Sequence, residues 1–213
     1  MSAHPEEVSS DDDLVSDVTF SVNRYHFGGF ALKIKENTES YVGSHVWKAG
    51  IVLCEYFEKE KISFAGKKVI ELGSGTGIVG ILAVLLGGDV TFTDKSFILK
   101  RTKQNISANL PPSCKKRTKV CVLSWGDDQK NFPSNYDVIL GADIVYCRSA
   151  YPFLLQTLKH LSNEMTTIYI SSEMRPNLVS SIFHEKQLPP QFNYETVHRK
   201  ESENIVVYKL TKK

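Results

Sequence analysis

Hydrophobic and polar positions repeat with two different periods along the chain, and the changes from one to the other predict its elements. In "RYHFGGFALKIKE", apolar positions alternate with polar ones on either side of Gly28 and Gly29. This pattern predicts two short strands joined by a two-residue turn. In "SHVWKAGIVLCEYFEKE", apolar side chains recur every three or four residues. That spacing predicts an amphipathic helix.

From Lys67 onwards, strand-like and helix-like segments alternate. The predicted order is strand 67–72, helix 77–86, strand 89–94, helix 96–110, strand 119–124, strand 136–143, helix 151–161, strand 166–172 and a short helix near 177–185. Repeated strand–helix units of this kind predict a parallel sheet with helices on both faces and right-handed crossovers.

The end of the chain has a different pattern. "FNYETVHR" and "NIVVYKL" are separated by the four residues "KESE". Since four residues are too few for a helical crossover, these runs predict an antiparallel hairpin. Seven strands with an antiparallel last pair differ from an ordinary dinucleotide-binding sheet, whose final strands are parallel. We therefore expect an α/β fold of the class I (seven-β-strand, Rossmann-like) methyltransferase type.

The length of 213 residues fits one domain with an N-terminal extension. Residues 1–17 are polar and acidic, and we expect them to form a disordered tail. Residues 18–66 are expected to hold the hairpin and a helix that packs on the core. Residues 67–213 are expected to form the methyltransferase core.

Charge, cysteine content and apolar runs argue against a metal-binding, disulfide-bonded or membrane-spanning protein. The six acids of the tail oppose no Lys or Arg, so removing them from the formal net charge of +2 leaves +8 on the rest of the chain. The four cysteines form no CxxC pair, and neither a disulfide framework nor a metal site is expected. The longest apolar run, Ile78–Leu86, is too short to span a bilayer. An acidic N-terminus is unlike a secretory signal, so a cytoplasmic location is expected.

Three glycines at alternate positions follow an acidic residue in "VIELGSGTGIVG". Such glycines let backbone N–H groups approach a nucleotide. A dinucleotide-binding loop would need its third glycine at position 78, which is Ile78, and no Gly-Lys-Ser/Thr of a P-loop follows. Asp94 ends the next strand, where its carboxylate can accept hydrogen bonds from ribose hydroxyls. The alternative is that Asp94 caps the helix that begins near Ser96.

The segments "ELGSGTGIVGILAVLLGGDVTFTD", "LSWG" and "LGADIVY" occur in this order. With them the chain resembles the protein lysine methyltransferases of methyltransferase family 16, from about Trp47 to Tyr208. The resemblance implies S-adenosylmethionine as the cofactor and a lysine side chain of a protein as the acceptor. It also implies a cofactor site at Trp47, Gly73, Ser74, Gly75, Asp94, Trp125 and Ala142. The family's D-x-x-Y acceptor motif matches Asp143 and Tyr146.

Each of these side chains also has a purely structural interpretation. Trp125 is expected to cover the adenine face, and Trp47 the methionine end, but either indole can instead fill space beside the sheet. Asp143 is expected to position the incoming ammonium, with proton transfer left open, and its alternative is a helix cap. Tyr146 offers a ring face or a hydroxyl to the lysine Nε, and its alternative is core packing.

The resemblance implies elongation factor 1-alpha as the protein substrate, with Hsp70-type chaperones as the alternative. It also implies a cytoskeletal (centrosomal) pool beside the cytoplasmic one. We expect a monomeric protein. Two other functions stay open. "CKKRTK" can contact phosphates of a nucleic acid, although we expect it to be a solvated loop. The same fold also accommodates small-molecule methyltransferases.

Overall fold

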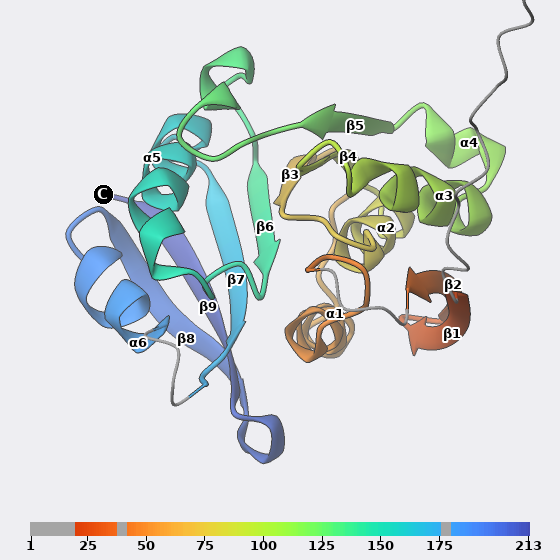
Figure 1. Ribbon diagram of the computed structural model, residues 1–213, viewed down its shortest axis with the longest axis horizontal. Helices are drawn as coiled ribbons and strands as arrows, with labels where there is room; N and C mark the ends of the chain where they lie inside the picture. The colour runs from red at the N-terminus through yellow and green to blue at the C-terminus, as the bar shows by residue number, and fades with distance from the viewer. Residues whose placement is uncertain (1–19, 38–41, 176–179) are drawn as a thin grey trace, which may run out of the picture.

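A seven-stranded sheet forms the centre of the molecule (Figure 1). The computed structural model describes residues 20–37, 42–175 and 180–213, so the tail expected at 1–17 lies outside the described residues. The strand order is β5-β4-β3-β6-β7-β9-β8. The strands are β3 (Lys68–Leu72), β4 (Asp89–Asp94), β5 (Thr118–Val122), β6 (Val138–Ala142), β7 (Thr167–Glu173), β8 (Phe192–Lys200) and β9 (Ile205–Lys212).

The strand directions confirm the predicted fold class. Strands β3 to β7 pair in parallel, whereas β9 is antiparallel to both β7 and β8. The chain moves outward from β3 to β4 and β5, and then returns to place β6 on the other side of β3. Ligands of open α/β sheets bind beyond the carboxyl ends of the strands at such a reversal. The topology therefore directs attention to the ends of β3, β4 and β6.

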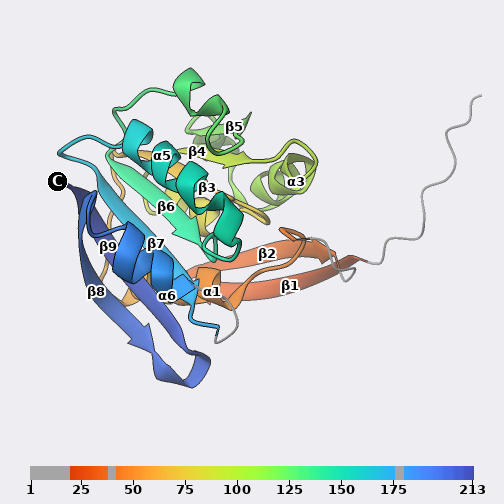
Figure 2. The same cartoon turned by 60° about the vertical axis from the view of Figure 1, so that its left-hand side comes forward.

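Helices cover both faces of the sheet, as Figures 1 and 2 show. They are α1 (Lys48–Lys59), α2 (Ile78–Leu85), α3 (Leu99–Asn109), α4 (Pro112–Lys115), α5 (Tyr151–Leu161) and α6 (Ser180–Ile182), with a π-helical turn at Phe183–Gln187 and 3-10 turns at Asp128–Asn131, Arg148–Ala150 and Glu201–Glu203. Of the helix predicted near 177–185, the described part begins at Ser180. Helix α3 begins later than predicted, because the N–H of Ile98 bonds to the carbonyl of Lys95 in a turn.

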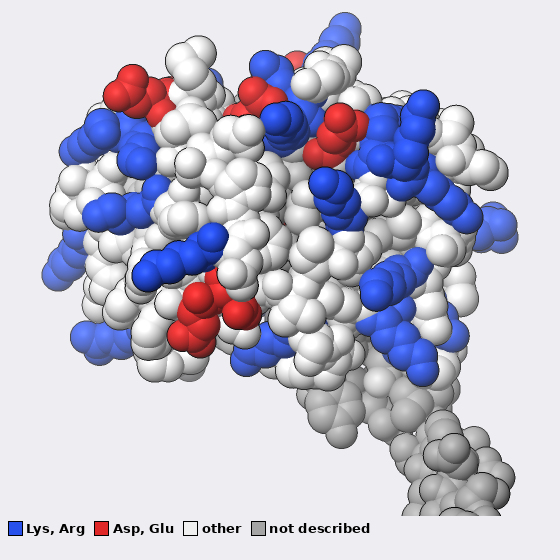
Figure 3. Space-filling view, turned by 90° about the horizontal axis from the view of Figure 1, so that it is seen from above, with Lys and Arg blue, Asp and Glu red and all other residues white. Residues whose placement is uncertain are grey.

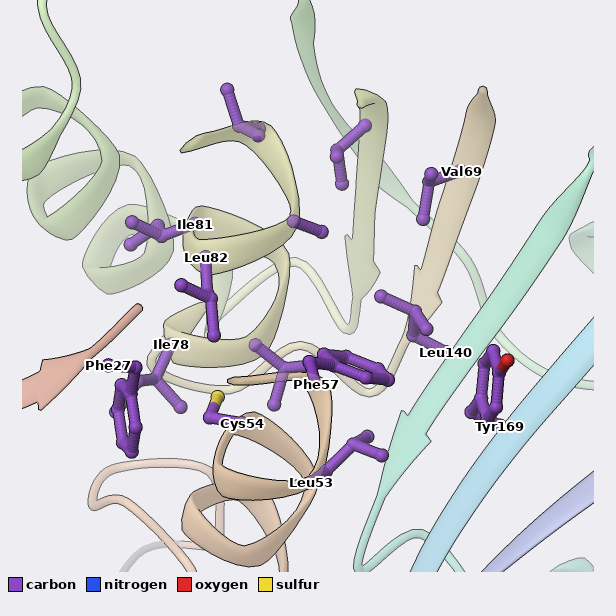
Figure 4. Close-up of a cluster of buried hydrophobic side chains, with 14 of the residues drawn as sticks. Phe27, Leu53, Cys54, Phe57, Val69, Ile78, Ile81, Leu82, Leu140 and Tyr169 are labelled. Atoms are coloured by element: carbon purple, nitrogen blue, oxygen red, sulfur yellow. The ribbon is translucent and has the colours of Figure 1, made fainter. Parts of the chain in front are cut away.

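Two hydrophobic clusters lie on opposite faces of the sheet. Neighbouring residues of β3 point into different clusters: Val69 packs with α1 and α2, and Ile70 packs with α5. Figure 4 shows the first cluster, which includes Phe57 of α1, Leu82 of α2 and Leu140 of β6. A strand buried on both faces lacks the usual alternation of apolar and polar residues, and in β3 the side chains of Val69, Ile70 and Leu72 are all buried.

Strands β1 (Phe20–Phe27) and β2 (Phe30–Asn37) form a separate antiparallel hairpin alongside α3 (Figure 2). Gly28 and Gly29, both at positive φ, make the predicted turn. The side chains of Asn105 and Asn109 on α3 each accept an N–H from β2 and donate to a carbonyl of β2, at Lys35 and Lys33 respectively. These amides bond the edge of β2 as a third strand would.

None of the helices in the described ranges has the length and apolar character needed to cross a membrane.

Candidate active site

The glycine loop between β3 and α2 is held from several directions. The N–H of Ser74 bonds to the carbonyl of Thr93 at 2.9 Å, and the hydroxyl of Thr102 on α3 donates to the carbonyl of Gly75 at 2.8 Å. Gly73 has a φ of +61°, and a Cβ placed on it would lie 2.9 Å from Cγ2 of Ile144. A side chain at position 73 would therefore be both strained and crowded. The loop forms a rigid concave backbone surface.

A cavity of about 650 Å³ opens beside this loop. Its size suits a ligand as large as a nucleoside derivative. All of the residues that sequence analysis selected line it: Trp47, Gly73, Ser74, Gly75, Asp94, Trp125, Ala142, Asp143 and Tyr146. Segments separated by up to 99 positions in sequence are thus brought to one crevice, at the reversal point of the sheet.

Asp94 connects β4 to the glycine loop. Its Oδ2 accepts the N–H of Gly75 at 2.9 Å, and its Oδ1 accepts the N–H of Lys95 at 2.7 Å. Burial raises the pKa of Asp94, and these two N–H donors oppose the rise. Helix α3 has Ile98 at its N-cap with no side-chain cap. The helix-cap alternative for Asp94 is therefore not what the structure contains.

Asp143 follows β6 with a left-handed backbone, at φ +54°. Its N–H bonds to the carbonyl of Ser171, and its Oδ1 accepts the N–H of Glu173 at 3.3 Å. Neither the 3-10 turn at Arg148–Ala150 nor α5 has a side-chain cap. The carboxylate is consequently bound to the end of β7, rather than to the helix that follows it.

Tyr146 stands at the mouth of the cavity with 40% of its surface exposed, so it is not a core residue. Burial of part of the side chain raises the pKa of the Tyr146 hydroxyl, and the charges of Asp94, Cys147 and Asp143 raise it further. The hydroxyl therefore stays protonated at neutral pH. Its O–H can donate a hydrogen bond there, and its oxygen can accept one.

The two tryptophans form parts of the cavity wall. Trp125 is partly buried and also packs against the hydrophobic cluster beneath α5, so wall and packing roles coincide. Trp47 is the N-cap residue of α1, and its ring centroid lies 4.3 Å from that of His45. An indole in such a wall offers an aromatic face and an N–H donor to a ligand.

The model of the family described as "Lysine methyltransferase" matches residues 27–187. The chain belongs to the lysine methyltransferase family. It is 47% identical to EEF1A lysine methyltransferase 3 of Mus musculus, over 92% of this chain and 84% of that protein. The Xenopus tropicalis protein of the same name is 46% identical over 98% of this chain and 92% of its own. Protein N-lysine methyltransferase METTL21A of Danio rerio is 41% identical over 80% and 78% of the two chains.

Solved structures share the fold at low sequence identity. SMU.776, a putative methyltransferase complexed with SAH, has a TM-score of 0.65 and 18% identity, covering 89% of this chain and 56% of that one. A TehB-like SAM-dependent methyltransferase from Corynebacterium glutamicum has a TM-score of 0.60 and 17% identity, covering 80% and 90%. Together with family membership, this makes the enzyme an S-adenosylmethionine-dependent protein-lysine N-methyltransferase.

The cavity fits this cofactor. The hydroxyl of Ser74 is buried and has no hydrogen-bond partner among the described residues, although it sits on the glycine loop that faces the cavity. Close by, Leu123, Trp125 and Ile144 provide an apolar wall. An unpaired buried hydroxyl beside an apolar wall suits a ligand that has both an aromatic base and a polar sugar or amino acid part.

Sequence analysis did not select several residues that line or support this site, and Glu71 and Arg175 are two of them. Glu71 lines the cavity below the glycine loop, and its burial raises its pKa to about 8. Its position directly before Leu72 and Gly73 was the available signal. Arg175 bonds to Asp143 from 32 positions away, and no local pattern marks it. Only the pairing of β6 with β7 brings the two together.

Proposed function

We propose that this methyltransferase acts on a lysine of translation elongation factor 1-alpha. The identity of 46–47% to the two EEF1A lysine methyltransferase 3 proteins, over most of both chains, supports this substrate. The chain is also up to 41% identical to METTL21A proteins. The alternative substrate is therefore the Hsp70-type chaperone that the family resemblance implies.

The observation that supports lysine methylation at this cavity is the convergence of Asp143 and Tyr146 on the crevice that also contains Gly73 and Asp94. We assign Asp94 to the ribose hydroxyls, and the glycine loop with Ser74 to the remaining polar part of the cofactor. Trp125 and Trp47 are assigned to its two ends, and Ala142 leaves space beside it.

S-adenosylmethionine supplies an electrophilic methyl group when it is bound. The acceptor lysine has an ordinary pKa of ~10.4 and must present the lone pair of its neutral amine. Asp143 attracts the ammonium form and orients it, and the ammonium releases one proton to solvent to give the neutral amine. Tyr146 presents its ring face to the same group, and its hydroxyl oxygen can accept a hydrogen bond from an N–H of the lysine.

The cavity mouth supports a protein substrate over a small molecule. Phe97, with 70% of its surface exposed, and the exposed Phe153 both border the cavity. Exposed aromatic side chains beside a site are typical of protein-binding surfaces. Basic side chains are spread over the face shown in Figure 3, with acidic ones between them, and Arg117 of the basic run bonds to the Gly88 carbonyl. A nucleic-acid substrate has less support.

The test is methyl transfer from labelled S-adenosylmethionine to purified elongation factor 1-alpha, an Hsp70 chaperone, total RNA and a cell lysate. We expect label in elongation factor 1-alpha. Label in Hsp70 alone would show that Hsp70, not elongation factor 1-alpha, is the substrate. Label in RNA would overturn the assignment of a protein substrate. Detection of the enzyme itself in cell fractions examines the cytoplasmic location that we also propose, and gel filtration examines the proposed monomer.

A further inference from the structure

Arg175 makes a two-pronged contact with Asp143 beside the end of β7. Its Nη2 lies 2.5 Å from Asp143 Oδ2, and its Nη1 donates to Asp143 Oδ1 at 3.3 Å. The same Nη2 lies 2.6 Å from Oε2 of Glu173. Arg175 therefore fixes both oxygens of the carboxylate proposed to receive the lysine. A planar guanidinium can do this, whereas an ammonium cannot.

The Asp143–Arg175 pair is largely buried, which makes the ion pair between them important. Only 4% of the Asp143 side chain is exposed, against 22% of the Arg175 side chain. A carboxylate so enclosed needs a paired cation, and Arg175 is the cation that contacts it among the described residues. The left-handed backbone of Asp143 adds a second constraint on the direction of its side chain.

The guanidinium is itself held in place. Its Cζ lies 5.2 Å from the ring centroid of Trp47, in the range of a cation–π contact. Trp47 and Asp143 both line the cavity. Arg175 is therefore fixed between two walls of the site, and is not a freely moving surface side chain.

The charge of this cluster also matches a lysine. Asp143 and Glu173 bring two negative charges and Arg175 one positive charge, so one negative charge remains uncompensated. An incoming ammonium can share the carboxylates without displacing the guanidinium. A site that paired every carboxylate with a resident cation would offer the lysine no net attraction.

We infer that Arg175 is a positioning residue for the acceptor lysine, which orients the Asp143 carboxylate while leaving the cluster one negative charge. This rests on the proposed role of Asp143 in the site. The alternative is that the ion pair only stabilises the fold and takes no part in methyl transfer.

A double-mutant cycle on the full-length protein separates the two interpretations. The variants are Arg175→Gln, Asp143→Asn and the combination, with kcat and KM measured for the protein substrate at saturating cofactor. Arg175→Gln alone should lower kcat/KM roughly 10- to 100-fold, because small displacements of positioned groups are costly. The double variant should be no slower than Asp143→Asn, since Arg175 then has no carboxylate to position.

A conservative variant and a matched control variant complete the experiment. Arg175→Lys keeps the charge and loses the fork, so it should be nearly as slow as Arg175→Gln. If Arg175→Gln does not fold, the cycle is run with Arg175→Lys. Arg199→Gln is the matched control, because Arg199 pairs with Glu201 on the surface of β8. It should stay within about twofold of the wild type in rate.

The outcomes distinguish this inference from the proposed function. A double variant slower than Asp143→Asn by the full factor of Arg175→Gln would overturn the positioning role, as would wild-type rates in Arg175→Gln. A wild-type rate in Asp143→Asn would overturn the acceptor site itself. If the wild-type enzyme labels another lysate protein instead of elongation factor 1-alpha, the substrate proposal fails and the cycle is measured on that protein.

Discussion

The Asp94 carboxylate accepts the backbone N–H of Gly75 at 2.9 Å, so one side chain ties the end of β4 to the middle of the glycine loop. The carboxylate has lone pairs left after this bond and the one from Lys95. It can shape the loop and still accept hydrogen bonds from a sugar. The two roles are separable by substitution.

Asp94→Ala should weaken S-adenosylmethionine binding by roughly 1 to 3 kcal/mol, through loss of charge-assisted hydrogen bonds. Asp94→Asn, which keeps one acceptor oxygen, should lose less. Isothermal titration calorimetry measures both affinities. Asp89→Ala is the control, because Asp89 is exposed at the opposite end of β4. Unchanged affinity in a folded Asp94→Ala protein would reduce Asp94 to a structural residue.

Tyr146→Phe should slow methyl transfer about tenfold or more while the melting temperature and cofactor affinity stay near those of the wild type. The hydroxyl is protonated at neutral pH, and its loss removes a group whose oxygen can accept an N–H of the lysine at the cavity mouth. Single-turnover methylation at saturating cofactor is the measurement. A small effect would leave the ring as the functional part of Tyr146. Tyr194→Phe, exposed to a similar degree on β8, should have no effect on the rate.

Glu71 should make stability depend on pH. Burial raises its pKa from 4.5 to about 8 in the folded protein, although the N–H of Gly80 opposes the rise. A raised carboxyl pKa gives a stability contribution that is complete below pH 4.5 and is lost as the pH rises through 8. Glu71→Gln should therefore match the wild type near pH 4.5 and melt higher at pH 9, by about 2–4 °C per kcal/mol.

Differential scanning calorimetry between pH 4.5 and 9 tests this prediction. Glu164→Gln, a change at an exposed position, should leave the pH dependence of the wild type unchanged. Parallel melting curves for Glu71→Gln and the wild type would show that Glu71 does not titrate in this range.

Phe97→Ser should raise KM for the folded protein substrate about tenfold, the size expected for an exposed aromatic anchor, with little change in kcat. Met165→Ser is the matched control, because Met165 is 86% exposed just before β7 and lies outside the cavity lining. Steady-state kinetics on the protein substrate decides between them. Equal KM values for the two variants would remove Phe97 from the substrate-binding surface.

The fold was predictable because its main signals are local. The change from helical to alternating periodicity at each element, and the four residues of "KESE", lead directly to the parallel sheet and its antiparallel end. Boundaries were less predictable where a turn competes with the helix. At α3, residues 95–98 form that turn, although the amphipathic pattern continues through them.

The candidate site was predictable where it follows strand ends. Gly73, Asp94 and Asp143 each come directly after or at the end of a strand, so their convergence follows from the parallel sheet. Arg175 could not be found this way. It contacts Asp143 only because β7, which precedes Arg175, pairs with β6, which precedes Asp143. The role of Glu71 depends on how completely the loop covers it, and burial of this kind has no sequence pattern.

The asparagine side chains that bond to β2 also bear on how copies of this protein meet one another. An uncovered strand edge offers N–H and C=O groups to any extended chain, and such edges promote aggregation. Asn105 and Asn109 occupy those groups at Lys35 and Lys33 from within the same molecule. In a concentrated sample, the hydrogen-bonding groups of this edge are therefore already paired at both positions, and a strand from a second copy of the chain has no hydrogen bonds to gain there.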